Sequence, residues 1–168
     1  MGGVHPTVAA KQMREHYPFI DHVVEGDGEL KMVDIVKGQD QRQDEVDVDK
    51  LPFPAWHKVD LRKYPARGRT KVDLGRFNGV WVGFEPRVSI EWSRSCSAHC
   101  NFCSSWWVKG RYRARDPYRM TDEIEQLVKE YGMRHFSFVD DVFSGDRERT
   151  LILCREIVRR KLKIAFHA

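Results

Sequence analysis

The sequence lacks the features that mark several classes of protein. None of its apolar runs approaches the roughly 18 residues that a membrane-spanning helix needs, so we expect no membrane segment. The first residues contain neither a basic start nor an apolar stretch, which excludes a typical secretory signal. The formal net charge is only +4 over 168 residues, with the two signs interspersed, so nothing indicates nucleic-acid binding. A composition with 41% hydrophobic and 32% charged residues is that of an ordinary globular protein, and we expect it in the cytoplasm.

Cysteine is also scarce, but three of the four cysteines stand within eight residues, at Cys96, Cys100 and Cys103. Thiolates are soft ligands that suit iron–sulfur clusters and zinc ions. A cubane cluster has four irons, so three thiolates leave one iron without a protein ligand, and an open position is typical of catalytic metal sites. The spacing therefore favours an iron–sulfur cluster. The alternative is a zinc-stabilised binding module completed by His99, although four ligands within eight residues would be cramped.

Strand-like and helix-like segments alternate after residue 87. Strands are expected over residues 88–92, 135–139 and 163–168, and helices over residues 121–131 and 146–160. Thr121 is predicted to cap the first helix and Gly132 to stop it. The second helix is expected to bury four side chains: Leu151, Cys154, Ile157 and Val158. This order predicts parallel βαβ units and hence an α/β fold.

Active residues of such folds stand at the carboxyl ends of the strands. The clustered cysteines follow the first expected strand, and Asp140 and Asp141 follow the second. We therefore expect both groups at the same edge of the sheet. Cys154 is expected to be a small buried apolar side chain rather than a ligand.

The first half of the chain is less regular. Gly2 and Gly3 precede an expected helix with Val8, Ala9, Met13 and Tyr17 on its apolar face, and a strand is expected over residues 20–24. Residues 39–50 are polar and acidic and are predicted to form a solvated linker. The proline-rich segment 51–57 is expected to be an extended connector pinned by Phe53 and Trp56. Residues 65–79 are predicted to be a basic loop, and a strand is predicted over 80–84.

The segment 109–117 is rich in cations and aromatic residues. Three interpretations remain open: a phosphate or RNA contact, a solvated loop whose long side chains cover the aromatic rings, or positive charge that stabilises an anionic cluster and its cofactor.

The cysteine loop resembles that of the radical S-adenosylmethionine (SAM) enzymes, whose Cys-x3-Cys-x-aromatic-Cys signature is met by Cys96, Cys100, Phe102 and Cys103. The resemblance implies that the cysteines hold a [4Fe–4S] cluster, that SAM chelates the open iron and that Phe102 lies against the cofactors. It further implies reductive cleavage of SAM to a 5′-deoxyadenosyl radical. A Gly-Gly-Glu motif usually holds the SAM ammonium after the second strand; Asp140-Asp141 occupy that place here.

The chain is most similar to the cobalamin-dependent branch of this family, which includes the anaerobic magnesium-protoporphyrin monomethyl ester cyclase and class B methyltransferases. The similarity is carried by Gly-Gly-x-His-Pro-Thr at the start, by the Leu-Pro-x-Pro-x-Trp connector and by residues 100–128. It implies that Gly2 and Gly3 lie against cobalamin. The preceding Asp-x-His-x-x-Gly motif is absent, so we expect the chain to be a fragment in which no cobalamin site is complete.

The resemblance implies three regions along the chain. Residues 1–30 would be the C-terminal remnant of a Rossmann-like cobalamin-binding domain, residues 31–87 a linker and connector, and residues 88–168 the first three strands of a (β/α) radical SAM barrel. It also implies methyl transfer or oxidative cyclisation of a small-molecule substrate, with a reducing partner such as flavodoxin or ferredoxin. A further hypothesis is that the chain alone is catalytically inert, because three strands cannot close a barrel.

Overall fold

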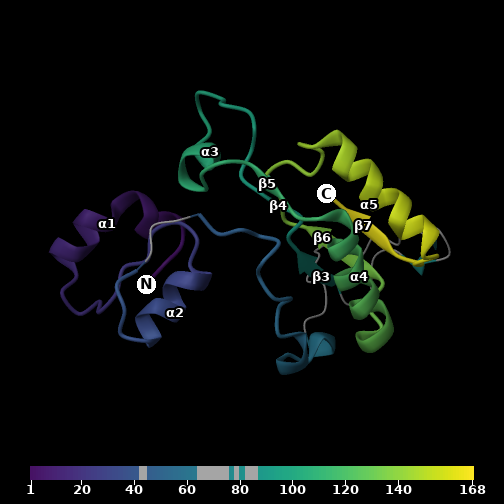
Figure 1. Ribbon diagram of the computed structural model, residues 1–168, viewed down its shortest axis with the longest axis horizontal. Helices are drawn as coiled ribbons and strands as arrows, with labels where there is room; N and C mark the ends of the chain where they lie inside the picture. Colours follow the sequence, from purple (N-terminus) through teal and green to yellow (C-terminus); the bar gives the residue numbers. More distant parts are fainter. Residues whose placement is uncertain (42–44, 64–75, 78–79, 82–86) are drawn as a thin grey trace. The chain divides into compact units, whose positions relative to one another are not determined.

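The computed structural model describes residues 1–41, 45–63, 76–77, 80–81 and 87–168 (Figure 1). The chain divides into two compact units. Unit 1 comprises Met1–Leu51 and Ser95–Tyr112, and unit 2 comprises Pro52–Arg94 and Arg113–Ala168. In the described part of the chain, none of the helices has the length and apolar character needed to cross a membrane. The boundaries expected at residues 30 and 87 stay predictions.

Unit 2 is built on a parallel three-stranded sheet. Its strands, in spatial order, are β3 (Arg87–Ile90), β6 (His135–Phe138) and β7 (Ala165–His167). Helix α4 (Pro117–Tyr131) precedes β6, and α5 (Arg147–Arg159) joins β6 to β7. Parallel neighbours need such crossover connections, which usually contain a helix. The predicted α/β class is confirmed; β3 and β6 are each one residue shorter than expected, and β7 has three residues instead of six.

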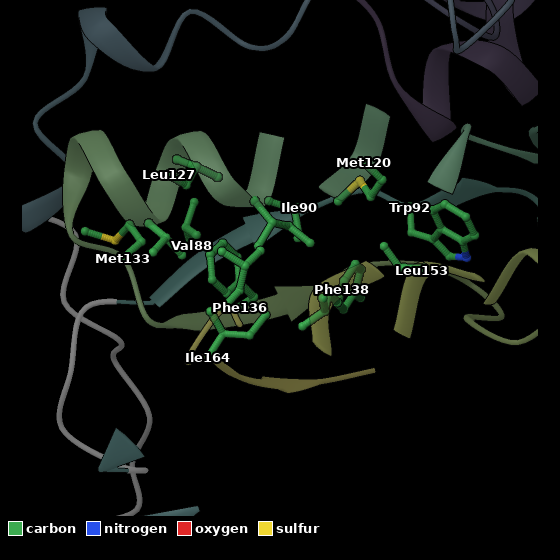
Figure 2. Close-up of a cluster of buried hydrophobic side chains, with 14 of the residues drawn as sticks. Val88, Ile90, Trp92, Met120, Leu127, Met133, Phe136, Phe138, Leu153 and Ile164 are labelled. Carbon is green, nitrogen blue, oxygen red and sulfur yellow. The ribbon is translucent and has the colours of Figure 1, made fainter. Parts of the chain in front are cut away.

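One face of this sheet forms the main hydrophobic core with α4 and α5 (Figure 2). The strands contribute Val88, Ile90, Phe136 and Phe138, and the helices contribute Ile124, Leu127, Leu153 and Ile157. Trp92, just beyond β3, is fully buried in the same cluster. Burial of one such side chain stabilises the fold by about 1.5–3 kcal/mol.

Helix α4 begins four residues earlier than predicted. The side chain of Asp116 caps it by accepting the Arg119 N–H at 2.9 Å, and Pro117 occupies the first turn. Thr121 lies inside the helix, where its hydroxyl donates to the Pro117 carbonyl at 2.7 Å, so its prediction as the cap was wrong. The predicted stop at Gly132 is confirmed, since this residue is the C-cap with a left-handed φ of 69°.

The buried face of α5 differs from the one predicted. Leu153, Glu156 and Ile157 are buried, whereas Val158 is 75% exposed and Leu151 is 36% exposed. Cys154 is half-buried rather than buried. The buried residues follow the i, i+3, i+4 spacing of one helical stripe, and the stripe includes a carboxylate that an apolar search does not recognise.

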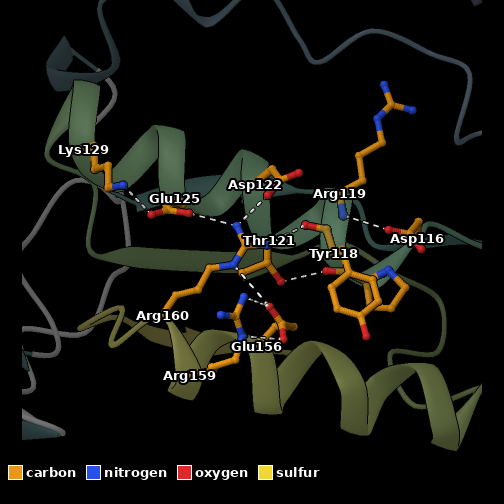
Figure 3. A network of polar contacts seen from close by, with 11 residues as sticks. Asp116, Tyr118, Arg119, Thr121, Asp122, Glu125, Lys129, Glu156, Arg159 and Arg160 are labelled. Atoms are coloured by element: carbon orange, nitrogen blue, oxygen red, sulfur yellow. Dashed lines mark hydrogen bonds and ion pairs between the residues drawn. The ribbon is translucent and has the colours of Figure 1, made fainter.

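The buried Glu156 belongs to an ionic network between α4 and α5 (Figure 3). Arg160 Nη1 contacts Asp122 at 2.5 Å and Glu125 at 2.9 Å on α4, while its Nε lies 3.3 Å from Glu156. Hydrogen bonds from Lys129 and Arg160 lower the pKa of Glu125. Arg160 therefore joins the two helices at their shared edge by charge-assisted contacts.

The connector segment is pinned to α4 as predicted. Trp56, which begins the 3-10 helix η1 (Trp56–Lys58), donates its indole Nε1–H to Glu123 Oε1 at 3.1 Å. The second oxygen of the fully buried Glu123 makes an ion pair with Arg115 at 2.6 Å, without a hydrogen bond of good geometry. The guanidinium of Arg115 also lies 5.8 Å from the ring centre of Phe53.

Unit 1 contains helices α1 (Val4–His16) and α2 (Glu29–Val36). The buried residues of α1 are Pro6, Ala10 and Met13, and the last two form a small core with Val23. Of the predicted apolar face only Met13 is buried, because a kink at Ala9 (φ −120°) interrupts the helical period. The strand expected over residues 20–24 is reduced to a single parallel bridge between Gly2 and Val24.

The acidic segment 45–50 is not simply a solvated linker. Val46 and Val48 are 3% and 8% exposed, and the Val46 N–H donates to Asp27 Oδ2 at 3.2 Å. Further along the chain are η2 (Leu61–Lys63) and a short antiparallel pair, β1 (Arg76–Phe77) with β2 (Val80–Trp81). Most of the predicted basic loop over 65–79 and residues 82–84 of the predicted strand lie outside the described residues.

Candidate metal centre

The three clustered cysteines lie in a loop that is closed at its base. The strands β4 (Ser93–Arg94) and β5 (Arg113–Ala114), which flank the loop in sequence, pair antiparallel. Within unit 1 the Ser95 hydroxyl donates a hydrogen bond to the carbonyl of Gly110 at 2.7 Å. The ends of segment 95–112 are therefore held together, which confines the cysteines to one short excursion of the chain.

All three cysteines are free thiols near the surface. Cys96 and Cys103 are half-buried and Cys100 is exposed. The Cys103 N–H donates to the Cys100 carbonyl at 3.0 Å, which forms a turn between these two residues. The Ala98 N–H points to Cys96 Sγ at 3.4 Å.

Three accessible thiols on one loop are a donor set that suits a [4Fe–4S] cluster. In the residues that the structure describes, no three cysteine, histidine or acidic side chains are gathered closely enough to hold a metal ion. The donor set suits the cluster in its chemistry, but the described structure does not gather the three sulfur atoms as the ligands of one metal group.

The two other predicted residues of this loop have different surroundings. His99, the fourth ligand in the zinc alternative, packs edge-on against Trp106 of α3 (Ser105–Val108), with 4.8 Å between the ring centres. Phe102 is 93% exposed. Its ring, placed between two of the candidate ligands in sequence, is apolar surface that a bound molecule can cover.

Sequence reasoning missed Ser95. Its φ of 68° is left-handed, which is uncommon for a residue other than glycine, and its side chain is fully buried. This conformation immediately before Cys96 sets the direction in which the chain enters the cysteine loop. Neither composition nor spacing marks such a residue, because the conformation depends on the partner at Gly110.

Two cations of the basic segment 109–117 are paired with carboxylates. Arg111 Nε lies 3.1 Å from Glu45 Oε2, and its backbone N–H donates to the other oxygen of Glu45 at 3.1 Å. Arg115 forms the buried pair with Glu123. These contacts favour a structural role for both arginines over a contact with phosphate or RNA.

The segment after β6 is bound to the segment after β3 within unit 2. Asp140 accepts the backbone N–H of Ser93 at Oδ1, and the Ser93 hydroxyl donates to the Val142 carbonyl at 3.3 Å. The indole Nε1–H of Trp92 donates to the Phe143 carbonyl at 3.1 Å. Asp140 thus helps to fix the chain just before it enters the cysteine loop.

The two neighbouring aspartates differ in environment. Burial raises the pKa of Asp140 above its ordinary value, although the hydrogen bonds from Ser93 act in the opposite direction. Asp140 Oδ2 is buried without a hydrogen-bond partner among the described residues, whereas Asp141 is exposed. The cysteines belong to unit 1 and the aspartates to unit 2, so their expected meeting at one edge stays a prediction.

The Gly-Gly pair begins helix α1. Gly3 has φ 110° and ψ −168°, a conformation that is essentially restricted to glycine. Its carbonyl accepts the N–H of Thr7 at 3.1 Å and the Thr7 hydroxyl at 2.8 Å. A Cβ on Gly2 would meet Val24 at an ordinary 3.5 Å. The backbone therefore explains glycine at position 3, and the predicted cobalamin contact of both glycines stays a prediction.

Cys154 stands apart from this loop, on α5. Burial raises the pKa of its thiol. It lines an open pocket of about 770 Å³ with mostly apolar neighbours, such as Ile157 and Ile164, and with two lysines, Lys161 and Lys163. The prediction that Cys154 packs as an apolar side chain and does not act as a ligand stays a prediction.

Comparison with known proteins found relatives along almost the whole chain. The chain is 30% identical to the anaerobic magnesium-protoporphyrin IX monomethyl ester cyclase of Rubrivivax gelatinosus over 98% of its own length and 32% of the relative's. It is 32% identical to the protein of the same name from Cereibacter sphaeroides, over 96% and 28% of the two lengths. The hopanoid C-3 methylase of Methylococcus capsulatus is 30% identical, over 99% and 33%.

No family model and no solved structure matches the chain. The chain spans about a third of the length of the curated relatives it matches. These relatives are enzymes of one kind, and they do not favour the zinc alternative. The alignment includes the segment with the cysteine signature, because it covers nearly every residue of the chain. The chain belongs to the B12-binding radical SAM family.

Proposed function

We propose that this chain supplies the cluster-binding part of a radical SAM enzyme, in which Cys96, Cys100 and Cys103 ligate a [4Fe–4S] cluster and SAM binds the iron left open. The observation that carries the proposal is the set of three free thiols on one closed, accessible loop. Family membership supports it. When bound, the reduced cluster and SAM supply the electron and the 5′-deoxyadenosyl radical of this family's chemistry.

The residues around the loop have supporting roles in this proposal. The Ser95–Gly110 hydrogen bond holds the base of the loop, so the three sulfurs can converge without loss of the flanking strands. The exposed ring of Phe102 covers the bound cofactors and excludes water from them. A loop whose base is already held lowers part of the ordering cost of binding.

Asp140 and Asp141 have different roles in this proposal. Asp141, which is exposed, accepts hydrogen bonds from the ammonium group of SAM, because a carboxylate is a strong acceptor for a cation. Asp140, half-buried and bonded to the Ser93 N–H, is a positioning residue that fixes the entry to the loop. The environments of the two side chains support this division.

We further propose a place for this chain in a longer protein of the family. There, residues 88–168 would form the first strands of a (β/α) barrel, and residues 1–30 would end a Rossmann-like cobalamin-binding domain. Gly2 and Gly3 would lie against cobalamin there. The reaction would be methyl transfer or oxidative cyclisation of a small molecule in the cytoplasm, where thiols stay reduced, with electrons from a flavodoxin or ferredoxin.

Anaerobic reconstitution of the chain with iron and sulfide tests the cluster. We expect a broad absorbance near ~400 nm, typical of thiolate-ligated clusters, and about four irons per chain. Replacement of Cys96, Cys100 or Cys103 by alanine should abolish the absorbance, whereas Cys154→Ala is the matched control that should retain it. Bound zinc without this absorbance would contradict the proposal and favour the zinc-stabilised binding module instead.

Equilibrium binding of SAM to the reconstituted chain tests the roles of the aspartates. Asp141→Ala should weaken binding by about tenfold or more and leave the absorbance intact, because one charge-assisted hydrogen bond is lost. Asp140→Asn, which keeps an acceptor oxygen for the Ser93 N–H, should retain both. Equal weakening by the two variants would contradict the division.

A further inference from the structure

The face of the parallel sheet that points away from α4 and α5 is polar. The strand register places six residues on it in two rows, since side chains alternate along each strand. Five of the six are polar: Arg87, Ser89, His135, Ser137 and His167. Parallel sheets are usually apolar on both faces because both are covered by packed elements. This face therefore does not have the composition of a second core.

The two rows differ in exposure. In the first row, His135 and Ala165 are 4% and 6% exposed. In the second row, Ser89 and His167 are exposed and Ser137 is half-buried. The second row lies nearer the carboxyl ends of the strands, where ligands bind in open α/β sheets. The open part of the face is thus in the position of a binding site.

The second row carries a preformed hydrogen bond. Ser137 Oγ lies 2.8 Å from His167 Nε2, across the neighbouring strands β6 and β7. Ser89 stands beside Ser137 in register on β3. None of the six positions on this face carries an acidic side chain, and Arg87 adds a positive charge. Within these six positions the row therefore offers hydrogen-bond donors with no carboxylate among them, while Glu91, Asp140 and Asp141 follow at the ends of β3 and β6.

We propose that Ser89, Ser137 and His167 form a binding site for an oxyanion of a small molecule, a carboxylate or a phosphate. The imidazole donates its Nε2–H to Ser137 Oγ, which leaves the Ser137 O–H to donate to one oxygen of the ligand. Ser89 donates its hydroxyl to a second oxygen. Binding at this row requires no cluster, whereas its assignment to the enzyme's substrate rests on the proposed function.

Nuclear magnetic resonance titration of the whole chain without iron tests the site, with propionate and inorganic phosphate as separate probes at low ionic strength. We expect saturable shifts of the His167 ring and the Ser137 amide with at least one probe, and the stronger probe identifies the oxyanion. Ser137→Ala and His167→Gln should each weaken binding by at least about tenfold, the loss expected for one hydrogen bond to a charged group. Unchanged far-UV circular dichroism verifies that both variants fold.

The matched controls are Ser144→Ala and His57→Gln, which replace exposed residues of the same types elsewhere in unit 2. They should bind both probes as the wild type does. Shifts that never saturate, or that the site variants leave unchanged, would overturn the proposal. Cluster assembly is measured in separate samples. Failure to assemble a cluster would therefore leave the titration result unchanged. Failure of the titration would likewise leave the cluster absorbance unchanged.

Discussion

Ser95 and Gly110 lie 15 residues apart in sequence, and the hydroxyl of the first donates to the carbonyl of the second at 2.7 Å. Between them stand all three candidate cluster ligands. A side-chain hydrogen bond from a residue with a left-handed backbone thus helps, together with the pairing of β4 and β5, to hold the base of the candidate metal centre. Such conformations persist only where surrounding contacts impose them.

Ser95→Ala should therefore disturb the cysteine loop. Loss of the buried hydroxyl leaves the Gly110 carbonyl without this donor, which costs about 1–3 kcal/mol where water cannot replace it. We expect fewer irons per chain after reconstitution, measured with the ~400 nm absorbance. Ser97→Ala, at an exposed position of the same loop, is the control and should load as the wild type does. Full loading of Ser95→Ala would contradict a role for this bond.

The buried stripe of α5 can be tested with two identical substitutions. Leu153 is fully buried and Leu151 is 36% exposed. Leu153→Ala should lower the free energy of unfolding by about 2–5 kcal/mol, because it removes core contacts and leaves a cavity. Leu151→Ala should cost clearly less. Urea unfolding followed by circular dichroism measures both, and equal losses would mean that the helix presents a different face to the core.

The ion pair that pins the connector should be sensitive to loss of one partner. Glu123→Ala leaves Arg115, whose side chain is 13% exposed, without its carboxylate and removes the acceptor of the Trp56 indole. We expect a loss of about 3–5 kcal/mol in the free energy of unfolding. Glu130→Ala, on the exposed face of the same helix, should change it by less than about 0.5 kcal/mol. A small effect of Glu123→Ala would show that the connector is held by other contacts.

The burial of Asp140 leads us to expect a particular pH dependence of the free energy of unfolding. Burial raises its pKa in the folded chain above the ordinary value of about 3.9. The folded state therefore binds more protons than the unfolded state, and the contribution of this group to stability falls as pH rises from that value through the raised pKa. Asp140→Asn removes this term, so its stability relative to the wild type should increase with pH over that interval.

Urea unfolding at several pH values from about 4 to 7 measures this difference. Asp141→Asn is the matched control, because Asp141 is the exposed neighbour of Asp140. A difference between Asp140→Asn and the wild type that stays constant with pH would rule out the proposed titration of Asp140.

Local sequence signals predicted the fold class and the end of α4, but not its start. The alternation of apolar segments correctly indicated the α/β class, and Gly132 ends α4 because glycine adopts the left-handed conformation of a C-cap. At the start of the same helix the N-cap is Asp116 and not Thr121 as predicted, because the local Asp-Pro signal begins the helix one turn earlier.

The sequence by itself determined the chemical character of the candidate metal centre, because three thiols within eight residues limit the ligands that they can bind. Only the tertiary structure decided which aspartate is buried, which stripe of α5 faces the core, and that Ser89, Ser137 and His167 form one row. These features depend on strand register and on contacts between residues far apart in sequence. Such pairings follow from how the whole chain packs, and no local pattern specifies them.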